Sequence, residues 1–479
     1  MLGKNLIDGR FVETSDAFDV INPATGLIVG SAAASSAKHV NEAVDAARVS
    51  QASWRRLTTL ERAGHLWDIA KRIRAEGDEF ARLIATEQGK VMELAEGEVE
   101  FAASYFEYTA EWARRIEGEV ITSDNAKEQI FLNFKPIGVV AGVLPWNFPF
   151  FLIARKMAPA LLTGNSIVVK PSEETPLCAL KFAELVQRSD LPNGVFNLVN
   201  GRGHEIGPVL CGHKDVGLVT FTGSVPTGRA IMRAAAENIT KVNLELGGKA
   251  PVIVLADADL EMAVSSIVAS RIINTGQVCN CAERVYVESS LHDEFVEMLA
   301  AAMKQVTYGD SIKSQDAGRT IDMGPLINEA AVSRIDGIVK SAIDDGAQLI
   351  EGGAVGETDP GYHYQPTVLA NCDHEMSVMK DEVFGPVLPV KAVADLDEAI
   401  ALANDSTLGL TSSIFTRNLN STLHAMRELD FGETYVNREH MEAFQGFHAG
   451  VRQSGIGGAD GKHGLYEFMQ THVTYIQEA

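Results

Sequence analysis

The segment SIVVKPSEETPLCALKFAELVQRSDLPNGVFNLV, residues 166–199, predicts a strand, a helix and a second strand in direct succession. Its two ends, SIVVK and GVFNLV, are short β-branched runs typical of buried strands, and LCALKFAELVQ between them has the apolar spacing of a helix. Such a strand–helix–strand unit is right-handed and places its strands in parallel. The segment therefore predicts an α/β fold with a parallel, nucleotide-binding type of sheet.

The same alternation extends in both directions along the chain. Further strands are predicted in GVVAGVL (138–144), VGLVTF (216–221) and KVNLEL (241–246), with helical spacing in FLIARKMAPALL, HEIGPVL and TGRAIMRAAAE. A helical region, residues 38–115, precedes this part and is opened by a hairpin signal, INPATGLIVG. A second α/β alternation follows from PVIVL (251–255) to about Phe447, in which GDSIKSQDAGRTIDMG (309–324) is expected to be a surface loop.

Length and charge limit the class of protein. A chain of 479 residues, 46% of them hydrophobic, is long enough for two or three domains, each with a core. The formal net charge is −23 and the sequence pI is about 5.0, so the average surface repels phosphate backbones and anionic lipids. We expect no nucleic-acid partner and no membrane partner.

Cysteines and targeting signals favour a reducing, cytoplasmic location. The five cysteines are odd in number and show no disulfide framework, and the N-terminus MLGKNLIDGRFVET has no apolar core of a signal peptide. The segment PIGVVAGVLPWNFPFFLIA (136–154) is uncharged and near the length of a membrane span. Pro145, Asn147 and Pro149 interrupt it, so we expect a strand, a turn and the start of a buried helix.

Two glycine-rich turns are candidates for nucleotide phosphate. GRGHEIG (201–207) is one residue off the dinucleotide pattern, and an ordinary strand-to-helix turn explains it equally well. FTGSVPTG (221–228) places Gly223 and Ser224 before a helix that opens near Pro226, where backbone N–H groups could meet a phosphate. Neither turn is specific by itself.

Charged residues at strand ends are a second group of candidates. Lys170 and Glu173 in KPSEETP follow the strand SIVV, at the sheet edge where open α/β sheets bind ligands, and could share the hydroxyls of a ribose. Glu245 in LELGGKAP ends an apolar strand, where partial burial would raise its pKa toward the range of a general base. Solvent-exposed surface charge is an equally good explanation of these residues.

The segment NTGQVCNCAER (274–284) holds two cysteines, Cys279 and Cys281, one residue apart. No second Cys or His cluster accompanies them as a zinc site would need, and the spacing is too tight for an ordinary disulfide or a thioredoxin-like pair. What remains is a nucleophile or two small buried side chains. The residues alone do not choose between these two.

Six motifs in this order resemble the aldehyde dehydrogenase superfamily over essentially the whole chain. They are PWNFP (145–149), KPSEETP, FTGSVPTG, LELGGK, NTGQVC and EVFGP (382–386). Within it the sequence is most similar to the lactaldehyde and glycolaldehyde dehydrogenase branch, notably in GQVCNCAERVYV and QGFHAGVRQSGIGGADGKHG. The resemblance implies a Rossmann-type cofactor domain, an α/β catalytic domain and a small β bridging element.

The resemblance also implies a mechanism. Cys279, in the GQxC pattern, would attack the aldehyde carbon, and the Asn147 amide with the Cys279 backbone N–H would hold the resulting oxyanion. Hydride would leave for the cofactor, and Glu245 would activate the water that hydrolyses the remaining thioester. Cys281 matches no catalytic position, and no metal is implied.

The implied cofactor is NAD. The matching positions are Leu144, Trp146, Lys170, Ser172, Glu173, Gly223, Ser224, Gly228, Arg334, Glu382 and Phe384. Leu144 and Trp146 would line the nicotinamide end. Glu173 favours NAD over NADP, because a carboxylate facing the ribose 2′ position repels a phosphate. GRGHEIG has no pyrophosphate role in this family.

The positions that commonly carry aromatic rings in the substrate tunnel are Arg155, Glu442 and His448 here. Hydrogen-bonding groups in place of rings favour a short hydroxylated aldehyde, such as lactaldehyde or glycolaldehyde, and Asn280 could contact the same hydroxyl. The arginine also leaves a semialdehyde carboxylate open. Alternatively, Arg155 and Glu442 merely pair with each other.

By the resemblance, residues 1–116 and 136–246 form the NAD-binding domain, 247–447 the catalytic domain, and 117–135 with 460–479 the bridging element. THVTYIQ (471–477) is expected to be an edge strand that joins another subunit, giving a homodimer or homotetramer. Two alternatives to a hydroxyaldehyde dehydrogenase are a semialdehyde dehydrogenase, for example for succinate semialdehyde, and a catalytically silent structural protein that binds NAD. A CoA-acylating enzyme is disfavoured, because that class lacks the base that Glu245 would supply.

Overall fold

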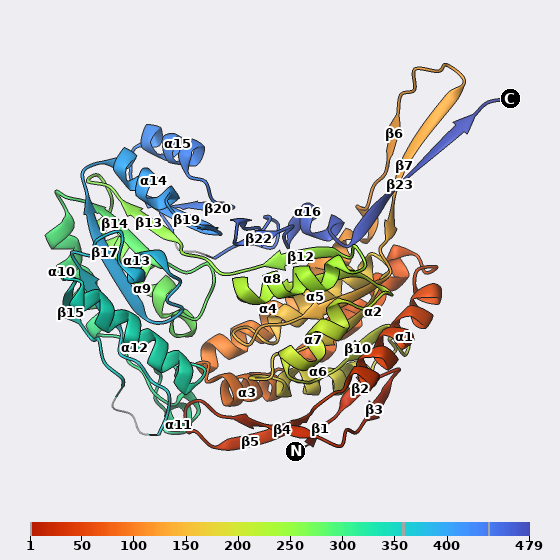
Figure 1. The fold of residues 1–479 in the computed structure, drawn as a ribbon, viewed down its shortest axis with the longest axis horizontal. Coiled ribbons are helices and arrows are strands. Elements are labelled where there is room, and N and C mark those ends of the chain that lie inside the picture. Colours follow the sequence, from red (N-terminus) through yellow and green to blue (C-terminus); the bar gives the residue numbers. More distant parts are fainter. Residues whose placement is uncertain (1, 357–359, 439–440) are drawn as a thin grey trace.

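Two α/β lobes and a projecting arm make up the protein (Figure 1). The structure, a computed structural model, describes residues 2–356, 360–438 and 441–479. The first lobe is built on an eight-stranded sheet and the second on a seven-stranded sheet. The arm is a three-stranded sheet that carries the C-terminus at its far end.

The eight-stranded sheet confirms the strand–helix alternation predicted for the first lobe. Its order is β22 (Gly455–Ile456), β12 (Lys241–Glu245), β11 (Val216–Thr222), β8 (Val139–Val143), β9 (Ser166–Lys170), β10 (Phe196–Leu198), β2 (Asn5–Ile7) and β3 (Arg10–Val12). The five strands from β12 to β10 are parallel, and β22, β2 and β3 are added antiparallel at the two edges. The fold class is thus the α/β class that residues 166–199 predict.

The helices of the first lobe pack on this sheet or on one another. They are α1 (Ala37–Trp54), α2 (Thr59–Ala75), α3 (Gly77–Gln88), α4 (Met92–Glu111), α5 (Phe151–Leu162), α6 (Leu177–Gln187), α7 (Gly203–Cys211) and α8 (Val225–Ala236), with a 3-10 turn, η1 (Trp112–Arg114), after α4. Every residue of α5 is buried, which is why its sequence has no polar face. The uncharged segment 136–154 therefore forms β8, a turn and a core helix, as predicted. In the described part of the chain no helix is long and apolar enough to cross a membrane.

The seven-stranded sheet is parallel except at one edge. Its order is β15 (Gln348–Glu351), β16 (Thr367–Ala370), β17 (Val387–Val393), β14 (Arg284–Glu288), β13 (Pro251–Val254), β19 (Thr411–Phe415) and β20 (Glu433–Val436), and β15 is antiparallel to β16. Its helices are α9 (Leu260–Ile272), α10 (His292–Lys304), α12 (Glu329–Asp344), α13 (Ser377–Lys380), α14 (Leu396–Asn404) and α15 (Leu419–Glu428). The second α/β alternation is thereby confirmed.

The arm pairs segments far apart in the sequence. Strand β23 (Met469–Gln477) runs antiparallel along β7 (Glu128–Pro136), from Met469 opposite Pro136 to Gln477 opposite Glu128, and β6 (Glu119–Ile121) lies on the other side of β7. The outer edge of β23 carries no further strand among the described residues. The smaller elements are β1 (Leu2–Gly3), β4 (Ala17–Ile21), β5 (Ile28–Ala33), β18 (Leu408–Gly409), β21 (Val451–Arg452), α16 (Gly461–Tyr466) and η2 (Ile273–Gly276).

The prediction that residues 309–324 form a surface loop is wrong in part. The segment contains a short helix, α11 (Ser311–Asp316), whose N-cap is Asp310. Ser311 is buried and its hydroxyl accepts a hydrogen bond of 2.8 Å from the Met92 N–H at the start of α4. The polar composition suggested exposure, but the Ser311 hydroxyl satisfies a backbone N–H of the neighbouring lobe.

Candidate active site

A cavity of about 270 Å³ is lined by residues of both lobes. It brings together all the side chains that the sequence predicts for catalysis and substrate contact. These are Asn147, Arg155, Glu245, Cys279, Asn280, Glu442 and His448. They come from the turn after β8, from α5, from the end of β12, from the segment after η2 and from the segment before β21. Residues far apart in the sequence thus converge on one enclosed space.

The two thiols of the segment 274–284, Cys279 and Cys281, lie in different environments. Cys279 is partly exposed, whereas Cys281 is 1% exposed and its Sγ lies 3.1 Å from the Val278 carbonyl oxygen. Burial raises the pKa of the Cys281 thiol to about 12. Because the thiolate is the nucleophilic form, Cys281 is unsuited to attack a carbonyl at neutral pH, and Cys279 is the better candidate.

The backbone before Cys279 is strained. Asn274 and Thr275, in η2, have positive φ angles of 47° and 62°. Such angles are unfavourable for a β-branched residue and persist only where surrounding contacts enforce them. Here the Asn274 amide donates to the Asn147 carbonyl oxygen at 3.1 Å, and the Thr275 hydroxyl donates to that of Gly324 at 3.0 Å.

A buried ion pair fixes the turn that carries Asn147. Lys90 Nζ lies 2.5 Å from Glu98 Oε2, with neither side chain exposed, and also donates to the Asn147 carbonyl oxygen at 2.8 Å. The other oxygen of Glu98 accepts from the Phe150 N–H at 2.9 Å, near the start of α5. The Asn147 amide itself donates to the Gln277 carbonyl oxygen at 2.9 Å, beside Cys279. Both ends of the Asn147 residue are therefore held.

Glu245 is a buried carboxylate without a hydrogen-bond partner in the described part of the chain. Its residue is 5% exposed, and neither carboxylate oxygen is hydrogen-bonded to any described residue. Burial raises the pKa of this carboxyl to about 7, although the positive charges of His448, Arg155 and Lys156 act against the shift. A carboxyl that is half ionised near neutral pH and has free lone pairs is suited to general base catalysis.

Arg155 is more fully paired than the sequence indicates. Its Nε donates to Asp460 Oδ1 at 3.0 Å, its Nη2 makes a second contact with the same carboxylate, and Nη2 lies 3.3 Å from Glu442 Oε1. The pairing of Arg155 with Glu442 that the sequence left open is thus present. Asn280 donates to the other oxygen of Glu442 at 2.6 Å. Two carboxylates therefore compensate the charge of Arg155.

His448 lies between two carboxylates. Its Nδ1 is 2.6 Å from Glu433 Oε1 on β20, and its Nε2 is 3.6 Å from Glu245 Oε2. Burial and Arg155 act to lower the pKa of His448, but Glu442, Cys279 and Glu433 outweigh them and raise it above its ordinary range. The surrounding carboxylates therefore favour the protonated form of the ring.

Three charged residues that were not predicted from the sequence, Lys156, Glu433 and Asp460, interact with residues that line this cavity. Each was hidden for the same reason, since its partner lies far away in the chain. Glu433 begins β20, at an edge of the seven-stranded sheet, and no strand was predicted there from the sequence. The cavity is also more aromatic than predicted: Phe101 and Phe151 both line it, with ring centroids 4.8 Å apart.

A groove of about 640 Å³ lies beside α7 and α8, at the carboxyl ends of the parallel strands. Its lining includes seven of the positions that the sequence predicts for the cofactor. They are Leu144, Trp146, Lys170, Ser172, Glu173, Gly223 and Ser224. We call this the α7–α8 groove. Its volume and its place at the carboxyl ends of the strands of an open sheet fit an extended nucleotide.

The polar groups of the α7–α8 groove also fit a dinucleotide. Lys170 Nζ lies 3.2 Å from Glu173 Oε2, and the other oxygen of Glu173 accepts from the Gly203 N–H at 3.1 Å. Gly203 belongs to GRGHEIG, so this turn does line the groove, at its Glu173 end. Ser224 is the N-cap of α8, and a Cβ at Gly223 would lie 2.4 Å from the Phe221 ring. This turn therefore needs glycine and offers a helix N-terminus to an anion.

The remaining cofactor candidates lie outside the lining of the α7–α8 groove. Glu382 Oε1 accepts from the Gly248 N–H at 2.9 Å, and Phe384 has its ring centroid 5.6 Å from that of Trp146. Arg334 donates to the Val383 carbonyl oxygen at 2.8 Å, so it supports the 382–386 segment. Gly228 packs in α8, where a Cβ would lie 2.8 Å from Leu246.

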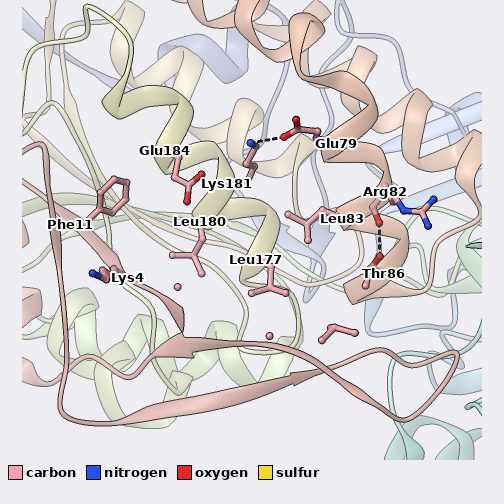
Figure 2. A pocket seen from close by; sticks show the side chains of 13 residues that line it. Lys4, Phe11, Glu79, Arg82, Leu83, Thr86, Leu177, Leu180, Lys181 and Glu184 are labelled. Carbon is pink, nitrogen blue, oxygen red and sulfur yellow. Dashed lines mark hydrogen bonds and ion pairs between the residues drawn. The ribbon is translucent and has the colours of Figure 1, made fainter. Parts of the chain in front are cut away.

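A larger cavity, of about 710 Å³, lies between α3, α6 and the strands β1 and β5 (Figure 2). Its cations are already paired: Lys181 with Glu79 at 2.6 Å, and Lys4 with Glu13 at 2.6 Å. None of the residues predicted for catalysis lines it. The chemistry therefore belongs to the smaller cavity.

Comparison with known proteins agrees with these observations. Residues 11–474 match the model of the aldehyde dehydrogenase family. Lactaldehyde dehydrogenase of Escherichia coli (strain K12) is 55% identical over 473 residues, which is 98% of this chain and 98% of that protein. The 3,6-anhydro-alpha-L-galactose dehydrogenase of Vibrio sp. (strain EJY3) is 40% identical over 475 residues, again 98% of each.

The same relationship is found in three dimensions. A crystal structure of lactaldehyde dehydrogenase from Escherichia coli superposes with a TM-score of 0.97 at 54% identity, covering 100% of this chain and 99% of that chain. The resemblance read from six sequence motifs is confirmed by a match over nearly the whole length. The chain belongs to the aldehyde dehydrogenase family.

Proposed function

We propose that this protein oxidises a short hydroxylated aldehyde, lactaldehyde or glycolaldehyde, to the carboxylate with NAD. The observation that carries the proposal is the meeting of Cys279, Asn147 and Glu245 in one cavity of about 270 Å³, where the buried Glu245 carboxylate has no hydrogen bond to any residue that the structure describes. Nucleophile, oxyanion donor and base are the groups that acyl transfer to water requires.

In the proposed reaction, the Cys279 sulfur forms a bond to the aldehyde carbon and gives a thiohemiacetal. The Asn147 amide, already aligned by its bond to the Gln277 carbonyl oxygen, and the Cys279 N–H would stabilise the oxyanion. The chemistry that a bound nicotinamide dinucleotide supplies is the acceptance of a hydride. Glu245 then takes a proton from water, whose oxygen attacks the thioester, and the C–S bond breaks to release the acid.

Glu173 supports NAD rather than NADP as the partner of the α7–α8 groove. Its carboxylate is held in place by Lys170 and by the Gly203 N–H. A fixed negative charge at the adenosine ribose would repel a 2′-phosphate. We expect a higher kcat/KM with NAD than with NADP and a smaller ratio in Glu173→Gln; an unchanged ratio in that variant would remove Glu173 from cofactor selection.

The charges of the cavity support a hydroxyaldehyde over a semialdehyde. His448 and Arg155 lower the pKa of Glu442 against the effect of burial, so Glu442 is ionised and can accept a hydrogen bond from a substrate hydroxyl. The same charge repels a substrate carboxylate, and Arg155 is already neutralised by Asp460 and Glu442. Relative kcat/KM for lactaldehyde, glycolaldehyde and succinate semialdehyde, each with both cofactors, tests this point. A preference for succinate semialdehyde would favour the second candidate.

Asn280 offers a sharper test of the hydroxyl contact. It donates to Glu442 at 2.6 Å, next to the proposed nucleophile. Asn280→Ala should lower kcat/KM more for lactaldehyde than for propanal, which has the same carbon chain without the hydroxyl. An equal loss for the two aldehydes would contradict the contact. A catalytically silent protein would show no NADH formation with any aldehyde of the panel.

We also propose that the arm joins subunits. Strand β23 has one free edge among the described residues, and an unpaired edge strand can extend the sheet of a second copy. The division into cofactor domain, catalytic domain and bridging element, with the boundaries given above, stays a prediction. Size-exclusion chromatography should report a dimer or tetramer, and a monomer would contradict this assignment.

A further inference from the structure

Two segments that serve different parts of the proposed reaction are in direct contact. The nucleophile segment, residues 274–284, carries Cys279, and the 382–386 segment carries the cofactor candidates Glu382 and Phe384. Hydride transfer requires both segments at once, because the hydride leaves the carbon bonded to Cys279 for the cofactor. The way in which the two segments are held together therefore bears on that step.

Arg271, near the end of α9, is a buried cation that joins the two segments. In the nucleophile segment its guanidinium donates to the carbonyl oxygens of Ala282 at 2.6 Å and of Gly276 at 3.3 Å, on opposite sides of the nucleophile in the chain. In the 382–386 segment its Nε donates to the Gly385 carbonyl oxygen at 2.6 Å, and its Nη2 contacts the same oxygen. One side chain thus bonds the backbone of both segments.

The carboxylate of Glu283 joins the same segments through the opposite backbone group. It pairs with Arg271 and accepts hydrogen bonds from the N–H groups of Val383 and Phe384. Phe384 has a positive φ of 50°, which a residue with a side chain adopts only where its surroundings enforce it. Hydrogen bonds to charged groups are roughly twice as strong as those between neutral groups. The backbone of the 382–386 segment is therefore firmly held.

The backbones also approach closely. A Cβ at Gly276 would lie 2.4 Å from the Gly385 carbonyl oxygen, and a Cβ at Gly248 would lie 2.5 Å from the carbonyl oxygen of Cys279. The Gly248 N–H donates to Glu382 Oε1 at 2.9 Å, so the turn after β12 contacts both segments. Because the backbones leave no room for a side chain between them, a shift of one segment displaces the other.

We propose that Arg271 is a positioning residue for hydride transfer, which fixes Cys279 relative to the 382–386 segment. This inference rests on the proposed function. In that step the C–H bond of the thiohemiacetal breaks, the hydride leaves with its electron pair for the cofactor, and a lone pair of the oxyanion forms the thioester C=O bond. No bond to Arg271 changes. A displacement of about 1 Å between reacting groups can cost about 10²-fold in rate.

Arg271→Lys separates this role from the stability of the buried charges. The lysine keeps a positive charge beside Glu283, which also remains paired with Lys249 at 2.7 Å. An ammonium is a point charge on one nitrogen, so it does not reproduce the planar fork that bonds Gly385 and Ala282 at the same time. The variant therefore changes the geometry and leaves the charge balance in place.

Two reactions of the same cavity measure the role. The first is NADH formation from lactaldehyde in a single turnover, which includes hydride transfer. The second is hydrolysis of p-nitrophenyl acetate without NAD, which uses the thiol, the oxyanion donors and the base but transfers no hydride. In Arg271→Lys the rate of NADH formation should fall by about 10- to 100-fold, whereas the rate of ester hydrolysis should stay within about twofold of wild type.

An isotope effect identifies the affected step. With lactaldehyde deuterated at the aldehyde carbon, the ratio of the protium to the deuterium rate of NADH formation should be larger in Arg271→Lys than in wild type, because hydride transfer is the step that has slowed. Arg271→Gln, which keeps hydrogen-bond donors without the charge, should show the same pattern. A general loss of structure would not raise this ratio.

The matched control is Arg417→Lys. Arg417 is exposed and pairs at 3.1 Å with Asp259, the N-cap of α9, so the same chemical change is made at the other end of the helix that carries Arg271. This variant should leave both reactions and the isotope effect unchanged. Circular dichroism and a thermal melt show whether each variant is folded.

Four results would overturn the proposal. An equal loss in the two reactions would place the effect at the nucleophile or in the fold as a whole. Unchanged NADH formation in folded Arg271→Lys and Arg271→Gln would remove the positioning role, as would an isotope effect equal to that of wild type. If neither variant folds, Arg271 serves the fold and not hydride transfer. Failure of the proposed function is distinguishable, because the wild-type protein would then form no NADH with any aldehyde of the panel.

Discussion

Two buried glutamates on either side of Cys279 have opposite environments. Behind the nucleophile segment, Glu283 accepts from Lys249 at 2.7 Å, from Arg271 at 2.8 Å and from the N–H groups of Val383 and Phe384 at 3.0 and 3.1 Å. In the cavity, Glu245 has none of these bonds to the described residues. Burial alone would raise the pKa of both carboxyls.

The charged groups beside each carboxyl decide whether burial raises its pKa in the end. At Glu283, Arg271 and Lys249 overcome desolvation and lower the pKa to about 2, whereas at Glu245 desolvation prevails and raises the pKa to about 7. A carboxylate whose oxygens all have hydrogen-bond partners is a structural element, and Glu283 in this way ties the start of β14 to the 382–386 segment. A carboxylate whose oxygens lack such partners keeps its lone pairs available for chemistry. The comparison therefore assigns stability to one glutamate and catalysis to the other.

Glu245→Gln should produce the largest effect on activity. The amide is isosteric and cannot take a proton from water, so we expect steady-state kcat to fall by about 10²- to 10⁴-fold. The first NADH equivalent should still form, since attack by Cys279 does not need this carboxylate as base. Stopped-flow absorbance at the NADH band measures both phases. Steady turnover at the wild-type rate would show that Glu245 is not the base.

Glu283→Gln should act on stability instead. It leaves Lys249 and Arg271 buried without their countercharge, and breaking a buried pair costs about 3–5 kcal/mol. The measurement is denaturant unfolding followed by fluorescence, with Glu96→Gln, an exposed glutamate of α4, as the control. If both variants unfold at the same denaturant concentration, the buried cluster contributes no net stability.

The two glutamates should also divide the pH dependence between them. Glu245 must be ionised to act as base, so kcat should rise with pH through about 7 and level off above it. Glu283 has a folded pKa lowered from 4.5 to about 2, so the stability it contributes is present above pH 4.5 and is lost as pH falls toward 2. Measurements of kcat and of the free energy of unfolding over the same pH series check these two pH dependences. A rise of kcat centred near pH 4.5 would contradict the assignment of Glu245 as the base.

Cys281→Ala should have the smallest effect. The thiol is buried beside the Val278 carbonyl oxygen and Arg271, and its pKa is raised to about 12. We expect kcat within about twofold of wild type and a modest loss of stability from the smaller side chain. A strong loss of turnover in a folded variant would reopen the choice between the two cysteines.

Local sequence patterns predicted the elements of this fold well. The five parallel strands from β12 to β10 and the four helices from α5 to α8 were all predicted, because β-branched runs and helical spacing are local properties. The helix α11 was missed, since a polar segment of six residues has no apolar period to read. The Ser311 hydroxyl is buried against the Met92 N–H, which lies far away in the chain.

Those residues of the candidate site that lie in a family motif could be predicted from the sequence. Cys279, Asn147 and Glu245 lie in such motifs and converge as expected. Asp460 lies within the quoted segment 445–464 and Glu433 outside it, but neither was predicted as a partner, because an ion pair between positions 155 and 460 leaves no trace in the neighbouring sequence. For the same reason the sequence could not show that Arg155 is already compensated. The polarity of the cavity was overestimated, since Phe101 of α4 and Phe151 of α5 also line it.

The most direct test is to trap the acyl intermediate. Glu245→Gln is mixed with NAD and lactaldehyde, quenched in acid, digested and analysed by tandem mass spectrometry of the peptide that contains both Cys279 and Cys281. The account predicts one lactoyl group per subunit, located on Cys279, with one NADH released for each. An adduct on Cys281, or NADH released without any acylated cysteine, would contradict it.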